Sequence, residues 1–327
     1  METQILSGSE GIDAAVDLLK TEKVVALPTE TVYGLAGNAF SPKALVSIFE
    51  AKGRPLSDPL IVHLLDLSWL DRVVTLTPEL KKMVMALGAA FWPGPMTLLL
   101  PRNAAVPDLV TAGLETVAVR IPANPVMRHV LSALELPLAA PSANRFGRIS
   151  PTSAQDVLAE LGGQIPLILD GGPCQHGLES TIVWPHDGVL QILRPGPITG
   201  EQLSSFGKVI AQPVAGKAPG SLASHYAPRK KLSWYDPTMP PRRDVGLLAF
   251  SQAVGGYGAI EILSSSGDLQ EAAANLYGAL RRLDESDVIS LVVEKIPEHG
   301  IGAAIMDRLR RAVTDLIEQQ SNKSKKN

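Results

Sequence analysis

Short apolar segments bounded by glycine or proline alternate with longer amphipathic segments along the first two-thirds of the chain. The short segments are expected strands and lie at 24–27, 97–100, 117–121, 138–140, 167–169, 181–184 and 189–193. The longer segments are expected helices and lie at 11–21, 41–51, 77–90, 124–135 and 152–161. Strands that are apolar on both faces need helices on both sides of their sheet. This alternation therefore predicts a mixed α/β sheet domain.

The chain changes character at residues 212–228, where neither a helical nor a strand period is present. We interpret this stretch, which contains both proline and glycine, as a linker. Strand signals return at 245–250, 260–263 and 288–293, and helix signals at 268–283 and 302–319. The predicted organisation is a first domain at 1–211, a linker at 212–228 and a small open α/β domain at 229–327.

Composition and charge narrow the class of protein. The 327 residues are 45% apolar and 19% charged, which is enough for a sizeable core. The net charge of −3 disfavours nucleic-acid binding over the whole surface. Cys174 is the only cysteine, so an internal disulfide is excluded. Because the sequence has no secretion signal and no apolar run of about 20 residues, we expect a cytoplasmic protein that does not enter membranes.

Polar motifs interrupt the apolar framework at five places. They are PTETVYG (28–34), KGR (52–54), PSAN (141–144), LEST (178–181) and RPG (194–196). Hydroxyl, amide and guanidinium groups inside an apolar framework are expected where a polar, anionic ligand is held. We therefore expect these motifs to form a ligand site.

Each motif by itself allows two interpretations. Lys52 and Arg54 can clamp a polyphosphate, or they can be cations placed favourably at a helix C-terminus. Arg120 lies in an otherwise apolar strand and needs a buried anion, either a protein carboxylate or a ligand carboxylate. Ser142 and Asn144 follow a predicted strand, where ligands bind in open α/β sheets, but the same residues also form ordinary turns. The LEST and RPG motifs likewise allow either a ligand site or an ordinary turn.

Several familiar kinds of site are not expected. The sequence has no GxxxxGK[ST] phosphate loop, no HExxH and no paired Cys/His spacing, so we predict no metal site built by the protein. Cys174 and His176 lie two residues apart and leave a thiol nucleophile as an alternative, although no third group that would orient the pair is evident.

Taken together, the motifs resemble those of the YrdC-like threonylcarbamoyl-AMP synthases in their longer, two-domain form. The segments that carry the resemblance are PTETVYGLAGNA (28–39), KGRPLSDPLIVH (52–63), FWPGPMTLLL (91–100), VAVRIP (117–122), APSANRFGRISPT (140–152), LESTIV (178–183), LRPG (193–196) and PGSLASHYAP (219–228). The resemblance implies a YrdC-like twisted mixed sheet flanked by helices and a small Rossmann-like C-terminal domain. It also implies that L-threonine, bicarbonate or CO2, and ATP are converted to L-threonylcarbamoyl-AMP and pyrophosphate.

The resemblance also assigns partners and residues. It implies Mg2+ bound with ATP, a downstream threonylcarbamoyl-transferase that modifies the tRNA adenosine next to the anticodon, and no tight tRNA binding. The L-threonine site would comprise Thr31, His63, Arg120, Ala140 and Thr181. The ATP site would comprise Lys52, Arg54, Asp58, Thr116, Ser142, Asn144, Ser150, Arg194 and Tyr226. Lys52 and Arg54 would act in catalysis. The segment 219–228 would fold over the nucleotide, so that Tyr226→Ala lowers product yield more than folded stability.

Two other functions compete with this one. A non-enzymatic RNA-binding or ribosome-associated module would use the same basic pocket and would not need a threonine-sized site. Carbamoyl transfer in metallocluster maturation is carried out by relatives that add zinc-finger cysteines, and the single cysteine of this chain argues against it.

Overall fold

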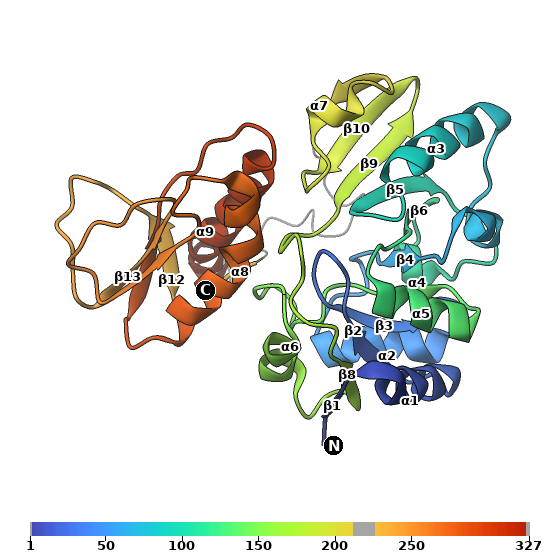
Figure 1. The fold of residues 1–327 in the computed structure, drawn as a ribbon, viewed down its shortest axis with the longest axis horizontal. Helices are drawn as coiled ribbons and strands as arrows, with labels where there is room; N and C mark the ends of the chain where they lie inside the picture. The colour runs from blue at the N-terminus through green and yellow to red at the C-terminus, as the bar shows by residue number, and fades with distance from the viewer. Residues whose placement is uncertain (1, 212–225, 325–327) are drawn as a thin grey trace.

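The computed structural model describes residues 2–211 and 226–324, with side chains up to residue 313. Its two sheets belong to two α/β domains (Figure 1). The strands of the first domain are β1 (Gln4–Leu6), β2 (Val25–Leu27), β3 (Gly34–Asn38), β4 (Ile61–His63), β5 (Met96–Pro101), β6 (Thr116–Arg120), β7 (Leu138–Ala139), β8 (Leu167–Leu169), β9 (Thr181–His186), β10 (Val189–Arg194) and β11 (Lys208–Ile210). Its helices are α1 (Gly8–Lys20), α2 (Pro42–Lys52), the 3-10 helix η1 (Leu67–Arg72), α3 (Pro78–Phe91), α4 (Asp108–Thr111), α5 (Pro125–Leu134), α6 (Ala154–Leu161) and α7 (Gly200–Leu203).

The first sheet is mixed, as expected from the sequence. Its eleven strands follow the order β1-β8-β2-β3-β7-β4-β6-β5-β9-β10-β11. Neighbours such as β4 and β6 are parallel, whereas β2 and β3 or β5 and β6 are antiparallel. The strands β1, β3, β4 and β11 were not predicted. They are short or, in β3, rich in glycine and alanine, so their local sequence carries little strand signal.

The helices begin where the sequence supplies a cap. The side chains of Ser41, Thr77 and Asn124 accept hydrogen bonds from backbone N–H groups in the first turns of α2, α3 and α5. Each of these helices also has proline in its first turn, where no N–H donor is needed. These caps fix the loops that join the helices to the sheet. Within the described parts of the chain, no helix has both the length and the apolar character to cross a bilayer.

The second domain has a small parallel sheet covered by two helices. Its strands are β12 (Lys231–Trp234), β13 (Val245–Ala249), β14 (Ala259–Ile262) and β15 (Ser290–Val293), in the order β12-β15-β13-β14. Its helices are α8 (Leu269–Glu285) and α9 (Gly302–Ser324). In Figure 1 both helices lie between this sheet and the first domain. The helices therefore form the contact surface of the second domain.

One apolar cluster joins the two domains. Val32, Ile149 and Leu178 of the first domain are buried together with Leu276 and Leu280 of α8. The backbones also approach closely, because a Cβ atom on Gly177 would lie 2.5 Å from the carbonyl oxygen of Ala274. The positive φ of Gly177 likewise suits glycine. The loop before β9 is therefore packed directly against α8.

Candidate active site

A cavity lies where several strands of the first sheet end. Its lining comes from the loops after β2 and β7, the loop before β9, and the strands β4, β6 and β10. The predicted site residues in this lining are Thr31, Arg54, His63, Arg120, Ala140, Ser142, Arg194 and Tyr226. Further lining residues are Thr29, Val32, Gly34, Ile61, Pro141, Glu179 and Ser180. Segments from residues 29 to 226 thus meet at one cavity.

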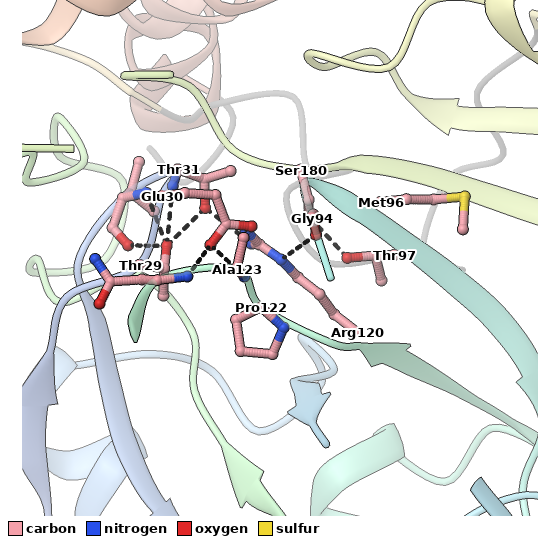
Figure 2. Close-up of polar contacts among 12 residues, drawn as sticks. Thr29, Glu30, Thr31, Gly94, Met96, Thr97, Arg120, Pro122, Ala123 and Ser180 are labelled. Atoms are coloured by element: carbon pink, nitrogen blue, oxygen red, sulfur yellow. Dashed lines mark hydrogen bonds and ion pairs between the residues drawn. The ribbon is translucent and has the colours of Figure 1, made fainter. Parts of the chain in front are cut away.

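Arg120 is paired with a glutamate that sequence analysis did not identify. Its Nη2 atom lies 2.5 Å from Oε1 of Glu30, and its Nη1 atom donates to Thr31 Oγ1 over 2.8 Å (Figure 2). Its Nε atom donates to the Gly94 carbonyl over 3.2 Å. The structural ion pair, one of the two interpretations of Arg120, is therefore present. Arg120 also lines the cavity.

Glu30 is held in its ionised form by these contacts. Burial would raise its pKa, but the charge and hydrogen bond of Arg120 lower it, and the net pKa lies below the usual value. The second carboxylate oxygen accepts from the backbone N–H groups of Ala123 and Asn124, over 3.0 and 3.3 Å. The loop after β2 is therefore locked to the segment that follows β6. Sequence analysis did not single out Glu30, because nothing in its local sequence distinguishes it from the other polar residues of the PTETVYG motif.

His63 remains a neutral imidazole at ordinary pH. Burial and the positive charge of Arg120 lower its pKa to about 3. Its Nδ1 atom is buried and has no hydrogen-bond partner among the described residues. The His63 ring lines the cavity, and one of the two nitrogens of a neutral imidazole is an acceptor, so His63 can accept a hydrogen bond from a ligand amine or hydroxyl.

Thr181, also assigned to threonine, lies outside the described lining. Its hydroxyl donates to the Ile198 carbonyl over 2.7 Å and accepts from the Ile198 N–H over 2.9 Å. The chain approaches closely here, because a Cβ atom on Gly196 would lie 2.5 Å from the Thr181 nitrogen. In this structure Thr181 therefore ties the LEST and RPG motifs together.

The KGR motif forms one corner of the cavity. Arg54 is paired with Asp58, with 2.9 Å between Nη2 and Oδ2, and it also donates to the carbonyls of Asp58 and Pro59. Lys52 is buried, and its Nζ atom donates to the carbonyls of Ser142 and Asn144 over 2.6 and 2.5 Å. Burial, with the nearby charge of Arg54, holds the pKa of Lys52 well below its usual value. Arg54 thus lines the cavity. Lys52 and Asp58 are not in the described lining but contact residues that are, Ser142 and Arg54.

Arg194 is fixed by the residue that precedes β9. Its Nε and Nη2 atoms donate to the carbonyl of Ser180 over 3.1 and 2.9 Å, and Nη2 also donates to the Ser180 hydroxyl over 3.0 Å. The Ser180 hydroxyl in turn contacts Thr97 Oγ1 at 2.7 Å. Together with Arg54 and Arg120, Arg194 gives the cavity three buried cations. A lining of this charge suits an anionic ligand.

The remaining predicted ATP ligands are not in the described lining. Ser150 donates to Oε1 of Glu179 over 2.6 Å, and Asn144 donates to the carbonyls of Arg145 and Arg148. Thr116 is the first residue of β6, at the end of that strand opposite to Arg120. The structure therefore places Ser150 and Asn144 beside the cavity and Thr116 away from it.

Tyr226 and Glu179 connect the cavity to the second domain. Tyr226 stacks on Tyr277 of α8 with 5.9 Å between ring centroids, and Glu179 is paired with Arg308 of α9 at 2.8 Å. Because Tyr226 is 2% exposed, Tyr226→Ala also removes buried packing, and its effect on stability is larger than the sequence alone indicates. The other residues of the predicted lid, 219–225, lie outside the described residues.

The thiol nucleophile, an alternative left open for Cys174 and His176, finds no support in this geometry. Burial raises the pKa of Cys174 to about 12, and neither Cys174 nor His176 is in the cavity lining. Among the side chains that the structure describes, in residues 2–211 and 226–313, no three His, Cys, Asp or Glu groups come together. The carboxylates of Glu30, Asp58 and Glu179 are each paired with an arginine.

Comparisons with known proteins agree with this architecture. Residues 17–196 match a family model described as telomere recombination, and residues 198–314 match the C-terminal domain of threonylcarbamoyl-AMP synthase. The chain is 41% identical to the threonylcarbamoyl-AMP synthase of Bacillus subtilis over 92% of both chains. It is 38% identical to that of Pyrococcus abyssi over 92% of this chain and 93% of the relative.

The likeness extends to the folded structure. The crystal structure of P. abyssi Sua5 in complex with L-threonine has a TM-score of 0.85 and 34% sequence identity, and it covers 96% of this chain and 98% of that chain. A second P. abyssi Sua5 structure, of a doubly substituted variant, has a TM-score of 0.83 and 33% identity, and it covers 95% of this chain and 96% of that chain. Both domains are thus shared with these proteins, and the chain belongs to the threonylcarbamoyl-AMP synthase family.

Proposed function

We propose that this protein makes L-threonylcarbamoyl-AMP and pyrophosphate from L-threonine, bicarbonate or CO2, and ATP. The observation that carries the proposal is that one cavity combines three buried arginines with a neutral histidine. We call Thr31, His63, Arg120 and Ala140 the threonine side of the cavity, and Arg54, Ser142, Arg194 and Tyr226 the nucleotide side. The solved relative bound to L-threonine supports this assignment of the substrate.

The chemistry needs no covalent nucleophile from the protein. The threonine amine adds to CO2 and loses a proton to give a carbamate. A carbamate oxygen then attacks the α-phosphorus of ATP, and the bond from that phosphorus to the pyrophosphate oxygen breaks. On the threonine side, the neutral ring of His63 accepts a hydrogen bond from the amine or hydroxyl, and Arg120 faces the carboxylate.

The residues of the nucleotide side stabilise charge and fix geometry. Arg54 and Arg194 offset the negative charge that develops on the departing pyrophosphate. Lys52 holds the carbonyls of Ser142 and Asn144 and so positions the loop that faces the nucleotide. The site also contributes to catalysis by aligning the carbamate oxygen with the α-phosphorus of ATP.

We further propose that Mg2+ enters with ATP and is held mainly by its phosphates. The carboxylates nearest the cavity, Glu30, Asp58 and Glu179, are already paired with arginines, which leaves them poor candidates for a dedicated metal site. Mg2+ would add charge neutralisation on the triphosphate. The product would pass to a threonylcarbamoyl-transferase acting on tRNA, and the net charge of −3 fits an enzyme that does not hold tRNA tightly itself.

The test is incubation of the purified protein with ATP, Mg2+, L-threonine and labelled bicarbonate. We expect labelled threonylcarbamoyl-AMP and an equal amount of pyrophosphate, dependent on all three substrates. Arg194→Met serves as the matched variant and should lose most of the product while the protein stays folded. Folded protein that binds threonine but forms no product would contradict the proposal. Salt-dependent RNA binding without ATP turnover would favour the RNA-binding module instead.

A further inference from the structure

A carboxylate in the cavity lining is held mainly by the second domain. Glu179 accepts from Arg308 Nε over 2.8 Å and from the Tyr277 hydroxyl over 2.9 Å at Oε2 and 3.1 Å at Oε1. Ser150 donates to Oε1 from the first domain over 2.6 Å. Arg308 and Tyr277 are both buried and come from α9 and α8. Glu179, which lines the cavity of the first domain, is thus held in place by two side chains of the second domain.

The same two side chains also hold Tyr226. The Tyr226 ring stacks on Tyr277 at an interplanar angle of 22°, and the guanidinium carbon of Arg308 lies 5.1 Å from the Tyr226 ring centroid. Tyr226 has a φ of 69°, a left-handed conformation that a side-chain-bearing residue seldom adopts unless its surroundings impose it. The next residue, Ala227, donates to the Gly147 carbonyl over 3.0 Å. Tyr226 is therefore fixed between the two domains.

The charge of Arg308 bears on the arginine of the nucleotide side. Burial would raise the pKa of Glu179, but the positive charges of Arg308 and Arg194 lower it to about 2. Glu179 is therefore an anion that two arginines share. Arg308 pairs with Glu179 from the second domain and also pairs with the neighbouring Asp307, at 2.7 Å. Because Arg308 offsets part of the charge of Glu179, that carboxylate competes less with an anionic ligand for Arg194. Without Arg308, Arg194 alone would have to balance Glu179.

We propose that the second domain completes the nucleotide side of the cavity, with Arg308 and Tyr277 as positioning residues that act through Glu179 and Tyr226. This inference rests on the proposed function, because it needs ATP to be the ligand of that side. The second domain is then part of the synthase site and not only an attachment to it. The loop at Gly177, packed on the backbone of α8, sets the distance between the two domains.

The same interface contains a control pair that does not reach the cavity. Arg281 of α8 is buried and pairs with Glu160 of α6 at 3.1 Å and with Asp156 at 3.6 Å. None of these three residues is in the described lining. Removal of Arg281 therefore weakens the docking of the domains without removing a contact to Glu179 or Tyr226.

The experiment compares Arg308→Met with Arg281→Met in steady-state synthesis, with KM measured for ATP and for L-threonine. The free energy of unfolding of each variant is measured in urea. We expect Arg308→Met to raise the KM for ATP about tenfold, because Glu179 and Tyr226 lose the side chain that fixes them at the nucleotide side. The KM for threonine should change less than about twofold. Arg281→Met should lose comparable stability and leave both KM values near those of the wild type.

Two milder variants keep the test decisive if Arg308→Met does not fold. Arg308→Lys keeps the charge but loses the planar guanidinium, and it should recover part of the ATP affinity. Tyr277→Phe keeps the ring that stacks on Tyr226 and removes only the hydroxyl that donates to Glu179. It should raise the KM for ATP by about threefold or less.

The outcomes separate this inference from the proposed function. A wild-type protein that makes no threonylcarbamoyl-AMP overturns the proposed function itself. An active wild type, with equal KM values for ATP in Arg308→Met and Arg281→Met, overturns only the positioning role. An equal rise of both KM values in Arg308→Met would likewise assign Arg308 to general stability. A selective rise in the KM for ATP, partly restored by lysine, supports the inference.

Discussion

Three buried carboxylate–arginine pairs lie at the cavity, and two of them are built differently. Glu30 and Arg120 both belong to the first domain, and their side chains are 5% and 4% exposed. Glu179 and Arg308 are equally buried but belong to different domains. The threonine side is therefore fixed by one sheet and its loops, whereas the nucleotide side is complete only when the domains are docked. Similar chemistry thus depends in one case on local folding and in the other on domain assembly.

The largest effect is expected from breaking the pair within one domain. Arg120→Met leaves Glu30 buried without its cation, and removal of one partner of a buried pair typically costs about 3–5 kcal/mol. We expect a loss of this size in the free energy of unfolding measured in urea, together with loss of threonine binding. A loss below about 1 kcal/mol would mean that the backbone N–H groups of Ala123 and Asn124 suffice for Glu30.

The pair between domains should give the next largest effect, visible in acid. The pKa of Glu179 falls from 4.5 to about 2 on folding, so its contribution is present above pH 4.5 and is lost as the pH falls towards 2. The shift corresponds to about 3 kcal/mol, of which about 2 kcal/mol is lost by pH 3. We expect the urea stability of the wild type to fall more steeply between pH 5 and pH 3 than that of Glu179→Gln. Parallel pH curves for the two proteins would show that Glu179 titrates as it does in the unfolded chain.

A larger share of the residues predicted for L-threonine than of those predicted for ATP lies in the cavity lining. Most strands and helices of the first domain follow from hydrophobic period and caps, and Thr31, His63 and Arg120 do lie together in one cavity. The identity of the partner of Arg120 stayed open, because a strand pattern does not tell which distant loop contacts a buried charge. Glu30 is 90 residues away in sequence and becomes a neighbour only in the folded sheet.

The partners of Glu179 could not be predicted from the sequence. Arg308 belongs to a helical segment that also contains Arg310 and Arg311, and such a run is indistinguishable from an exposed basic face. Only the packing of α9 against the first domain separates buried Arg308 from exposed Arg310. For Lys52 the sequence left two interpretations open, a phosphate clamp or a cation at a helix C-terminus. In the structure it is the last residue of α2, and its ammonium donates to two backbone carbonyls.

His63 offers a third effect, of about the same size, that reports on the threonine side alone. Its pKa falls from 6.5 to about 3 on folding, so the unfolded chain takes up a proton below pH 6.5 before the native protein does. Stability from this group is therefore present above pH 6.5 and is lost as the pH falls towards 3. Between pH 7 and pH 5 we expect a loss of about 2 kcal/mol in the wild type that is absent in His63→Gln. Equal losses in the two proteins would contradict a buried, neutral His63.

The smallest effect is expected from an ion pair that is not buried, which tests the premise that burial makes the other pairs important. Arg102 and Asp108 are 2.5 Å apart, but the Asp108 side chain is 79% exposed. Water and salt screen such a pair, so its contribution is typically below about 1 kcal/mol. We expect Asp108→Asn to change the free energy of unfolding by less than this, and the change should shrink in about 1 M NaCl. Arg120 and Glu30 are also 2.5 Å apart. If Asp108→Asn cost as much free energy of unfolding as Arg120→Met, contact distance and not burial would therefore set the cost. The two cavity pairs could then no longer be treated as a separate class from the surface pairs of the same protein.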